Sequence, residues 1–307
     1  MKVLVATEKP FAKEAVDGIR TIIEGAGYQL ALLEKYTDKS ALLSAVVDAD
    51  ALIIRSDKIT AEVISAAKNL KIVVRAGAGY DNVDLAAASE RGIVVMNTPG
   101  QNSNAVAELT LAMMIFMSRN HFTPGKGQEI MGKTLGILAY GNVGKLVARK
   151  AKALGMKVMA YDPFIEDGAV YEADGVEQAA SQEELFKNSN FVSLHIPATE
   201  QTKKSINYDL IMSMPKGAIL VNTARKEVID EEGLVKAMTE REDLKYVTDI
   251  AGAVQPELEE KFGKRVFATA KKMGAETNEA NVNAGLAAAN QIVGYLKDGI
   301  TRFQVNK

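Results

Sequence analysis

The stretch KTLGILAYGNVGKLVARKAKALGMKVMAYDPF, residues 133–164, decides the fold of this 307-residue chain. A short apolar run predicts a strand over residues 134–138, and the segment after it predicts a helix over residues 145–154. A second apolar run ends at Asp162. Strand, glycine-containing turn, helix and second strand make a βαβ unit, which is the building block of doubly wound parallel sheets.

The turn in this unit carries the spacing of a dinucleotide-binding loop, with Asp162 placed 18 residues after Gly144. Gly141 lets the backbone approach a pyrophosphate, and Gly144 lets the helix pack closely on the strand. Asp162 can accept a hydrogen bond from the ribose 2′-hydroxyl and would repel a 2′-phosphate, so NAD is predicted over NADP. The usual first glycine is Ala139, which the turn tolerates if its φ stays negative. The cofactor is expected on Gly141, Asn142, Val143, Gly144 and Asp162.

The same alternation of apolar runs and helical segments extends in both directions along the chain. Continuous apolar strands between helices predict parallel sheets that are covered on both faces. About ten such strands are expected, which are too many for one small sheet, so the sequence predicts two doubly wound α/β domains. Beyond the βαβ unit, the expected strands lie at residues 2–6, 51–55, 72–75, 93–97, 191–195, 218–222, 245–249 and 264–268.

Turn-forming residues near 99 and near 280 predict that one domain is inserted into the other. The outer, discontinuous domain is expected to be flavodoxin-like and to bind the substrate. The inserted domain is expected to be a Rossmann domain that binds NAD. The outer domain takes residues 1–99 and 280–307, with a helix over residues 284–297, and the inserted domain takes residues 100–279.

The composition excludes several classes of protein. A net charge of −2 gives no basic field for nucleic acid, and the absence of cysteine excludes disulfides and thiolate metal sites. The longest apolar run, residues 109–117, is well short of the roughly 20 residues that span a membrane. The sequence therefore predicts a cytoplasmic protein with a small-molecule substrate and with no metal, nucleic-acid or membrane partner.

Four further stretches follow one another in order: RAGAGYDNVDL (75–85), NTPGQNSNAVAELTLAMM (97–114), VSLHIPATEQT (192–202) and MPKGAILVNTAR (214–225). Together with the nucleotide loop, they resemble the D-isomer-specific 2-hydroxyacid dehydrogenase family. The resemblance is strongest to those members that act on D-3-phosphoglycerate. It implies that NAD and substrate bind in the cleft between two such domains, that a hydride passes between the substrate C2 and the nicotinamide, and that the protein is a homodimer.

Matched positions carry roles over from the family. Arg225 matches the arginine that grips the substrate carboxylate and polarises the C2 oxygen, a task that suits the paired donors of a guanidinium. Asp249 matches the acid that contacts the nicotinamide carboxamide. The cofactor is also expected to be lined by His195, Ile196, Pro197 and Thr223. The substrate carboxylate and phosphate are expected near Arg55, Ser56, Lys58, Ala76, Gly77, Ala78 and Gly79.

The proton-transferring histidine of the family is replaced here. The segment ATAKKMGAET, residues 268–277, places Lys272 at the histidine position and Lys271 beside it, and Gln255 stands where a glutamate orients that histidine. A lysine has an ordinary pKa of about 10.4, which should fall to about 7–8 for work near neutral pH. Burial and a neighbouring cation lower it, whereas a carboxylate raises it. Lys272 is predicted to be the acid/base and Lys271 to tune it or bind phosphate, and a register error of one residue would exchange them.

The remaining residues that titrate near neutral pH are two histidines. His195 is expected at a strand end with no proton role, and His121 is expected in a polar loop. An excess of cations near the expected site favours a substrate that carries both a carboxylate and a phosphate. These cations are Arg55, Lys58, Arg225, Lys226, Lys271 and Lys272.

The predicted function is NAD-dependent oxidation of D-3-phosphoglycerate at the entry to serine synthesis. Two alternatives stay open. One is another NAD-dependent D-2-hydroxyacid dehydrogenase, of the glycerate or hydroxypyruvate type. The other is a catalytically silent NAD-binding regulator. Because no tail follows Lys307, a C-terminal regulatory domain is not expected.

Overall fold

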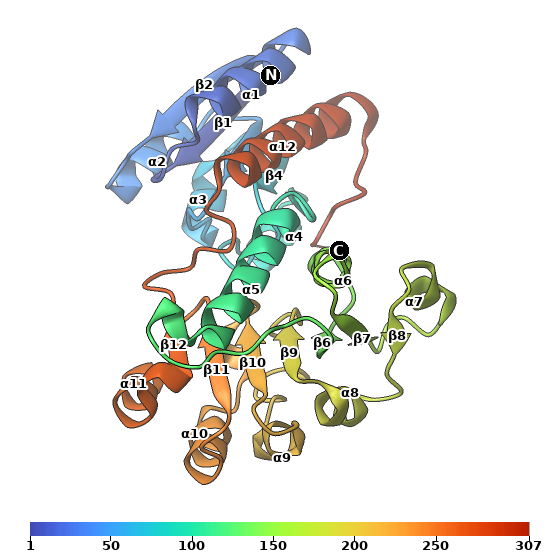
Figure 1. Ribbon diagram of the computed structural model, residues 1–307. Coiled ribbons are helices and arrows are strands. Elements are labelled where there is room, and N and C mark those ends of the chain that lie inside the picture. The colour runs from blue at the N-terminus through green and yellow to red at the C-terminus, as the bar shows by residue number, and fades with distance from the viewer. Residues whose placement is uncertain (307) are drawn as a thin grey trace. The chain divides into compact units, whose positions relative to one another are not determined.

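The computed structural model describes residues 1–306 and divides them into two compact units (Figure 1). The first unit joins residues 1–103 to the C-terminal segment that starts at Glu276, and the second unit is continuous from Asn104 to Ala275. Each unit is an α/β domain built on one parallel sheet, which confirms the predicted fold class. The substrate-binding and NAD-binding roles assigned to residues 1–99 with 280–307 and to residues 100–279 stay predictions.

The first unit contains a five-stranded parallel sheet with the strand order β2-β1-β3-β4-β5, which is the flavodoxin-like order. In this sheet Val3 pairs with Leu30 on one side and with Ala51 on the other. The strands are β1 (Lys2–Thr7), β2 (Gln29–Glu34), β3 (Ala51–Ile54), β4 (Ile72–Arg75) and β5 (Val94–Asn97).

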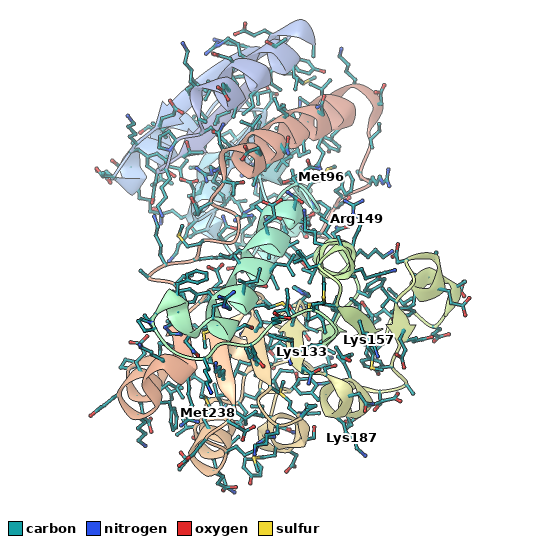
Figure 2. The ribbon with its side chains drawn as sticks, in the orientation of Figure 1. Met96, Lys133, Arg149, Lys157, Lys187 and Met238 are labelled. Carbon is teal, nitrogen blue, oxygen red and sulfur yellow. The ribbon has the colours of Figure 1, made fainter. Side chains whose placement is uncertain are left out.

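Helices cover both faces of this sheet, as its buried strands require. One apolar core lies between the sheet and helices α1 and α12, and a second lies between the sheet and helices α2, α3 and α4. Met96 in β5 is 1% exposed and belongs to the first of these cores (Figure 2). The helices are α1 (Lys13–Gly25), α2 (Lys39–Ala45), α3 (Ala61–Ala66), α4 (Leu85–Glu90) and α12 (Asn278–Asp298).

Helix α12 begins six residues before the expected start at residue 284. Thr277 caps it, because the Thr277 side chain accepts a hydrogen bond from the amide of Ala280 at 3.1 Å. The helix ends at Gly299, whose φ of 66° is easily reached by glycine. Helix α12 packs on α1 so closely that a side chain at Gly18 would overlap Leu286.

The second unit contains a seven-stranded parallel sheet with the strand order β12-β11-β10-β9-β6-β7-β8, the Rossmann order with one additional strand. Within it, β6 pairs with β7 on one side and with β9 on the other. The strands are β6 (Thr134–Leu138), β7 (Lys157–Tyr161), β8 (Glu177–Gln178), β9 (Phe191–Leu194), β10 (Ile219–Asn222), β11 (Lys245–Thr248) and β12 (Val266–Ala268).

The helices of the second unit also form two layers. Helices α5, α6 and α7 pack with one face of the sheet, and helices α8, α9, α10 and α11 pack with the other, where Met238 is 1% exposed (Figure 2). Among residues 1–306, every helix is too short or too polar to cross a lipid bilayer. The helices are α5 (Ser103–Ser118), α6 (Asn142–Ala153), α7 (Ala169–Ala173), α8 (Gln182–Asn188), α9 (Tyr208–Ser213), α10 (Glu231–Glu240) and α11 (Gln255–Phe262); 3₁₀ turns span Asn120–Phe122, Lys226–Val228 and Gly263–Arg265.

Strands β2 and β8 were not expected from the sequence. Strand β2 is an edge strand whose residues are mostly half-buried or exposed, so it lacks the continuous apolar run of the inner strands. Strand β8 has two residues, both of them exposed, at the opposite edge of the other sheet. Edge strands need less apolar sequence than central ones, which explains both omissions.

Candidate active site

The predicted site residues of the second unit all follow the carboxyl ends of its strands. The nucleotide loop follows β6, Asp162 follows β7, and His195 follows β9. Thr223 and Arg225 follow β10, Asp249 follows β11, and the Lys271–Lys272 pair comes shortly after β12. Because neighbouring strands are parallel, their carboxyl ends share one edge of the sheet, where doubly wound folds bind ligands. The topology therefore gathers residues that are far apart in the sequence.

The condition of a negative φ, under which alanine was expected to be tolerated at position 139, is not met. Its φ is +75°, in the left-handed region that normally favours glycine. The Ala139 amide still donates to the carbonyl of Tyr161 at 2.8 Å, whereas the next amide, of Tyr140, donates to Asp162 Oδ2 at 2.9 Å. The amides of Ala139 and Tyr140 thus both donate to residues at the end of β7. The left-handed conformation of Ala139 makes the turn between these two amides.

The two glycines of the loop differ in what surrounds them. A side chain on Gly144 would overlap the carbonyl oxygen of Ala139 and come within 3.1 Å of Ile137 Cγ2, so glycine is needed for packing there. A side chain on Gly141 would meet no atom of residues 1–306 within 4 Å. Gly141 is the residue that precedes α6, and no side chain caps the first turn of that helix. Free amides at a helix N-terminus suit a pyrophosphate group.

Asp162 is held in a fixed orientation by two backbone amides. Its Oδ2 accepts from Tyr140 and its Oδ1 accepts from the amide of Phe164 at 3.0 Å. A carboxylate can accept about four hydrogen bonds, so both oxygens keep capacity for a ribose hydroxyl. The half-buried position of Asp162 leaves it accessible to a ligand.

The residues expected to line the cofactor lie at the ends of β9 and β10. The His195 ring contacts the Ser193 hydroxyl at 2.8 Å, and burial lowers the pKa of His195 to about 3, so the ring is neutral. Pro197 is exposed and Ile196 is 9% exposed. Thr223 is buried, and its hydroxyl lies 3.0 Å from the hydroxyl of Thr110 in α5.

His121 does not lie in the polar loop that was expected. Its ring stacks on Phe116 with 4.5 Å between the ring centroids, and it also contacts Phe267 edge-on. Desolvation by these aromatic neighbours, with smaller effects from Lys245 and Lys264, lowers the pKa of His121. His121 therefore belongs to an aromatic cluster at the C-terminal end of α5.

Arg225 is presented by a turn that Asn222 holds in place. The buried Asn222 side chain accepts from the amide of Ala224 at 3.0 Å and donates to the carbonyl of Arg225 at 2.9 Å. Within residues 1–306, the half-buried guanidinium of Arg225 makes one hydrogen bond, at 2.9 Å, to the carbonyl of Ala224. A guanidinium has five donors, so most of them remain for a ligand. Asn222 was not predicted as a site residue, although a polar residue that ends an apolar strand is a usable signal.

Both lysines of the 271–272 pair are exposed. Burial was expected to desolvate the amine of Lys272, but the Lys272 side chain is exposed in the second unit. Gln255, at the expected glutamate position, donates from Nε2 to Glu259 Oε1 at 2.8 Å. The Gln255 Oε1 atom is buried without a hydrogen-bond partner among residues 1–306, and Gln255 lines a small cavity with Lys226 and Glu231.

Asp249 follows β11 and is 0% exposed. Its Oδ1 accepts from the amide of Met273 at 2.7 Å and from the Thr269 hydroxyl at 3.0 Å. Its Oδ2 accepts from the amide of Gly274 at 2.8 Å. The contact with a nicotinamide carboxamide, inferred from the family resemblance, stays a prediction for Asp249.

The predicted substrate residues of the first unit follow β3 and β4. Ser56 and Lys58 are exposed. The guanidinium of Arg55 lies over the ring of Phe11 and already donates to protein acceptors, so less of it remains for a phosphate. These acceptors are the carbonyls of Lys9 at 3.2 Å and Pro10 at 3.1 Å, and Asn281 Oδ1 in α12.

The loop Ala76–Gly79 is tied to the end of β5. The carbonyl of Gly77 accepts from the amide of Thr98 at 2.9 Å, and the carbonyl of Ala78 accepts from the Asn97 side chain at 2.6 Å. Gly77 has a φ of 147°, and the Arg75 guanidinium fills the space that a side chain at Gly77 would need. Arg75 was not predicted, and it adds a cation at this edge.

Asp57 was also missed by the sequence analysis. It is 2% exposed and accepts from the amides of Glu8 at 2.7 Å and Arg55 at 3.2 Å, and from the Tyr36 hydroxyl at 2.7 Å. Burial and this hydrogen bond raise the pKa of Tyr36. Asp57 thereby fixes the turn that carries Arg55, Ser56 and Lys58.

Known proteins resemble this chain over most of its length. A family model described as "D-isomer specific 2-hydroxyacid dehydrogenase, NAD binding domain" matches residues 106–277. The hydroxypyruvate reductase of Thermotoga maritima is 38% identical over 283 residues, which are 86% of this chain and 90% of that protein. The D-3-phosphoglycerate dehydrogenase of Methanocaldococcus jannaschii is 38% identical over 282 residues, which are 87% of this chain and 54% of that protein.

A solved structure agrees with these sequence matches. The NAD⁺-bound 3-phosphoglycerate dehydrogenase of Entamoeba histolytica is 51% identical, with a TM-score of 0.91 over 100% of this chain and 99% of that chain. The curated phosphoglycerate dehydrogenases from Methanocaldococcus jannaschii, Archaeoglobus fulgidus and Homo sapiens are longer, and this chain spans about half of each. The resemblance seen in the motifs is thus confirmed. The chain belongs to the D-isomer-specific 2-hydroxyacid dehydrogenase family, and its cofactor is NAD.

Proposed function

We propose that this dehydrogenase oxidises D-3-phosphoglycerate to 3-phosphohydroxypyruvate, the reaction at the entry to serine synthesis. The observation that carries the proposal is the set of accessible cations at the carboxyl edges of the two sheets. In the second unit, Arg225 is half-buried with most of its donors unused, and Lys271 and Lys272 are exposed. In the first unit, Lys58 is exposed. A substrate with both a carboxylate and a phosphate matches this charge.

The sheet topology suits a small substrate held between two cationic segments. Arg225 follows β10 and the lysine pair follows β12, with β11 between them. Adjacent strands lie about 4.8 Å apart, so the two segments start about 10 Å from each other. Long side chains that reach inward from both segments can hold the two ends of a three-carbon acid. Arg225 binds the carboxylate and polarises the C2 oxygen.

Bound NAD supplies the hydride acceptor. As the C2–H bond breaks with its electron pair, the C2 hydroxyl must lose a proton, and Lys272 Nζ accepts it. In the reverse reaction, Lys272 returns the proton to the oxygen. The pKa of the half-buried His195 is lowered to about 3, so its ring is a poor proton acceptor near neutral pH and is given no part in this proton transfer.

A hydroxypyruvate or glycerate substrate is the second candidate. The Thermotoga maritima relative is named hydroxypyruvate reductase and is matched over 90% of its length. The guanidinium of Arg55, expected near the substrate phosphate, is engaged by Lys9, Pro10 and Asn281. Both observations would fit an unphosphorylated substrate.

The test is NADH formation from D-3-phosphoglycerate, D-glycerate and D-lactate. We expect kcat/KM for D-3-phosphoglycerate to exceed the other two by at least about tenfold, or 1.4 kcal/mol. Lys58→Ala should lower use of the phosphorylated substrate more than use of D-glycerate. Equal use of D-glycerate would establish the second candidate, and NAD binding without turnover of any of the three acids would indicate a silent regulator.

The family resemblance also leads us to propose a homodimer in the cytoplasm. Light scattering of the purified protein, coupled to size-exclusion chromatography, measures the assembly. A mass near twice the 33.0 kDa of one chain is expected. A monomer at micromolar concentration would contradict the proposal.

A further inference from the structure

Asp249 binds two points of the segment that carries the lysine pair. Thr269 lies just before the lysines, and its hydroxyl shares its one proton between Asp249 Oδ1 at 3.0 Å and the Asp249 carbonyl at 2.8 Å. Met273 and Gly274 lie just after the lysines, and their amides donate to the two carboxylate oxygens at 2.7 and 2.8 Å. One buried carboxylate therefore closes a loop whose tip is Lys271–Lys272.

Little regular structure supports this loop. Strand β12 ends at Ala268 and helix α12 begins at Asn278, and no helix or strand lies between them. The Thr269 amide donates to the carbonyl of Thr248 at 3.1 Å, which fixes the start of the loop. After the lysines, the bonds from Met273 and Gly274 to Asp249 provide the next anchor. Hydrogen bonds from backbone amides to a carboxylate are charge-assisted and gain strength when buried.

Gly274 fits this arrangement for a steric reason. It is buried, and a side chain there would lie 3.0 Å from Asp249 Oδ2 and 3.3 Å from Val106 Cγ2. Such a side chain would crowd the carboxylate, so that a neighbouring atom would have to shift by a few tenths of an ångström. Glycine at this position therefore leaves room for the close approach of the backbone to Asp249.

The same carboxylate belongs to a network that reaches Arg225. The Asp249 amide donates to the carbonyl of Asn222 at 3.0 Å, and the Asn222 side chain holds the Arg225 turn. Thr248 strengthens the link, because its hydroxyl donates to the Asn222 carbonyl at 3.1 Å. Residues at the ends of three adjacent strands thus fix the two cationic segments with respect to each other.

We propose that Asp249 is a positioning residue that sets the place of Lys272 through the backbone of residues 269–274. The catalytic consequence rests on the function proposed above for Lys272. The role differs from a contact with the nicotinamide carboxamide, because Asp249 is 0% exposed and already accepts three hydrogen bonds. At most about one acceptor site of its carboxylate is left for another donor.

The test compares Asp249→Asn with Thr269→Val in the full chain. Asparagine keeps the shape of the side chain but replaces one carboxylate oxygen with an NH₂ group, which cannot accept a hydrogen bond. One of the backbone amides of Met273 and Gly274 therefore loses its acceptor. We expect the Met273 and Gly274 amides of Asp249→Asn to exchange hydrogen at least about tenfold faster. We expect kcat to fall about tenfold or more while the KM for NAD changes less than about threefold. Thr269→Val removes one of the three bonds and should give smaller changes in the same direction.

A double variant separates positioning from general loss of structure. In the Lys272→Ala background, Asp249→Asn should lower kcat by less than about twofold, because the group that it positions is already gone. A full additional loss would show that Asp249 acts otherwise. Asp162→Asn is the matched control, since it should raise the KM for NAD and leave exchange at Met273 and Gly274 unchanged.

Three results would overturn the proposal: unchanged amide exchange in Asp249→Asn, a raised KM for NAD with intact kcat, or unchanged exchange in Thr269→Val if Asp249→Asn does not fold. Faster exchange at Met273 and Gly274, together with normal activity of Lys272→Ala, would keep Asp249 as the anchor of the loop. That combination would reject the catalytic role of Lys272 instead.

Discussion

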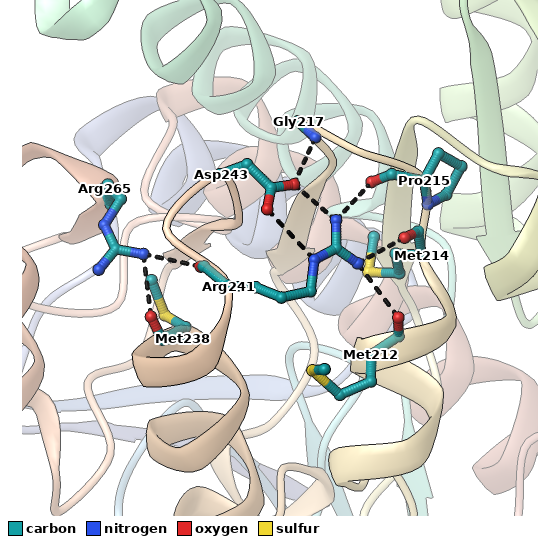
Figure 3. A network of polar contacts seen from close by, with 8 residues as sticks. All are labelled: Met212, Met214, Pro215, Gly217, Met238, Arg241, Asp243 and Arg265. Carbon is teal, nitrogen blue, oxygen red and sulfur yellow. Dashed lines mark hydrogen bonds and ion pairs between the residues drawn. The ribbon is translucent and has the colours of Figure 1, made fainter.

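The arginines at the two edges of the seven-stranded sheet differ in how many of their donors bind to protein acceptors. At the amino edge, before β10 and β11, the guanidinium of Arg241 makes five hydrogen bonds (Figure 3). At the carboxyl edge, after β10, Arg225 makes one bond, to its neighbour's carbonyl. The acceptors of Arg241 are the carbonyls of Met212, Met214 and Pro215 and both carboxylate oxygens of Asp243.

The difference separates a structural cation from one that is available to a ligand. Arg241 joins the loops before two strands, and Arg265 adds to this network by donating to the carbonyls of Met238 and Arg241 (Figure 3). A cation whose donors are satisfied by the protein stabilises the fold. Arg225 keeps most of its donors, and Arg55 in the first unit is intermediate, with three protein acceptors.

Removal of the proposed acid/base should have the largest effect. Lys272→Ala is expected to lower kcat by about 10²–10⁴-fold, the usual contribution of a positioned acid/base. NAD affinity should change little, because the nucleotide loop lies after β6. Steady-state kinetics and NAD titration check both. If Lys271→Ala abolishes turnover and Lys272→Ala does not, the two lysines exchange roles.

Arg241→Met should destabilise the loops at the amino edge of the sheet without lowering the catalytic rate. It leaves three carbonyls and Asp243 without their shared donor, and we expect the free energy of unfolding to fall by about 2–4 kcal/mol. The kcat of the folded protein should stay near normal, which urea unfolding and kinetics at low temperature can establish. A large loss of kcat with normal stability would contradict this division of the two edges.

The preference between NAD and NADP tests whether Asp162, at the carboxyl edge, faces the ribose of the cofactor. NAD should be preferred over NADP by at least about tenfold in kcat/KM, or 1.4 kcal/mol. Asp162→Ala should narrow this ratio by removing the negative charge near the ribose. Equal use of both cofactors by the unmodified protein would show that Asp162 does not face the 2′-position.

A low pH should destabilise the protein by weakening the interaction of Arg241 with Asp243 at the amino edge of the sheet. The hydrogen bond from Arg241 is the main cause that lowers the pKa of Asp243, to about 2 from 3.8. A lowered folded-state pKa stabilises the protein above pH 4, and this contribution is lost as the pH falls from about 4 towards 2. After allowance for solvent screening, we expect a loss of about 1 kcal/mol. Unfolding curves across this range should show a smaller acid dependence in Arg241→Met.

The smallest effect concerns the nucleotide loop. Ala139→Gly should raise the free energy of unfolding by about 0.5–1 kcal/mol, because the φ of +75° is strained for alanine. Thermal unfolding of the two proteins measures the change. Destabilisation by glycine would mean that the alanine methyl packs usefully in the turn.

Much of the fold could be predicted because it depends on local pattern. Buried central strands such as β3 and β9 are continuous apolar runs, and Gly144 signals close packing of helix and strand. The φ of Ala139 could not be predicted, since it is imposed by bonds to β7, more than 20 residues away. Strand β2 was not predicted because its residues are mostly half-buried or exposed, so it lacks a continuous apolar run.

The site was harder to predict because its contacts join distant residues. The motifs located Arg225 and Asp249, yet the bonds from Met273 and Gly274 to Asp249 cross 24 and 25 residues. Arg55 was expected to be open to a ligand, and its bond to Asn281 crosses 226 residues. A sequence pattern identifies which polar residues end a strand, but not which of them are already satisfied by the protein.

The inserted arrangement of the chain has a consequence for its synthesis. Residues 104–275 form one continuous unit, and all of its strands are made before α12. The core of the five-stranded sheet is completed later, because α12 covers part of it and is made after the inserted unit. At 5–20 residues per second, the first five strands would remain without α12 for roughly 10–40 s. During that interval an apolar face of the nascent chain is open to chaperones, although its strands are made before the inserted unit.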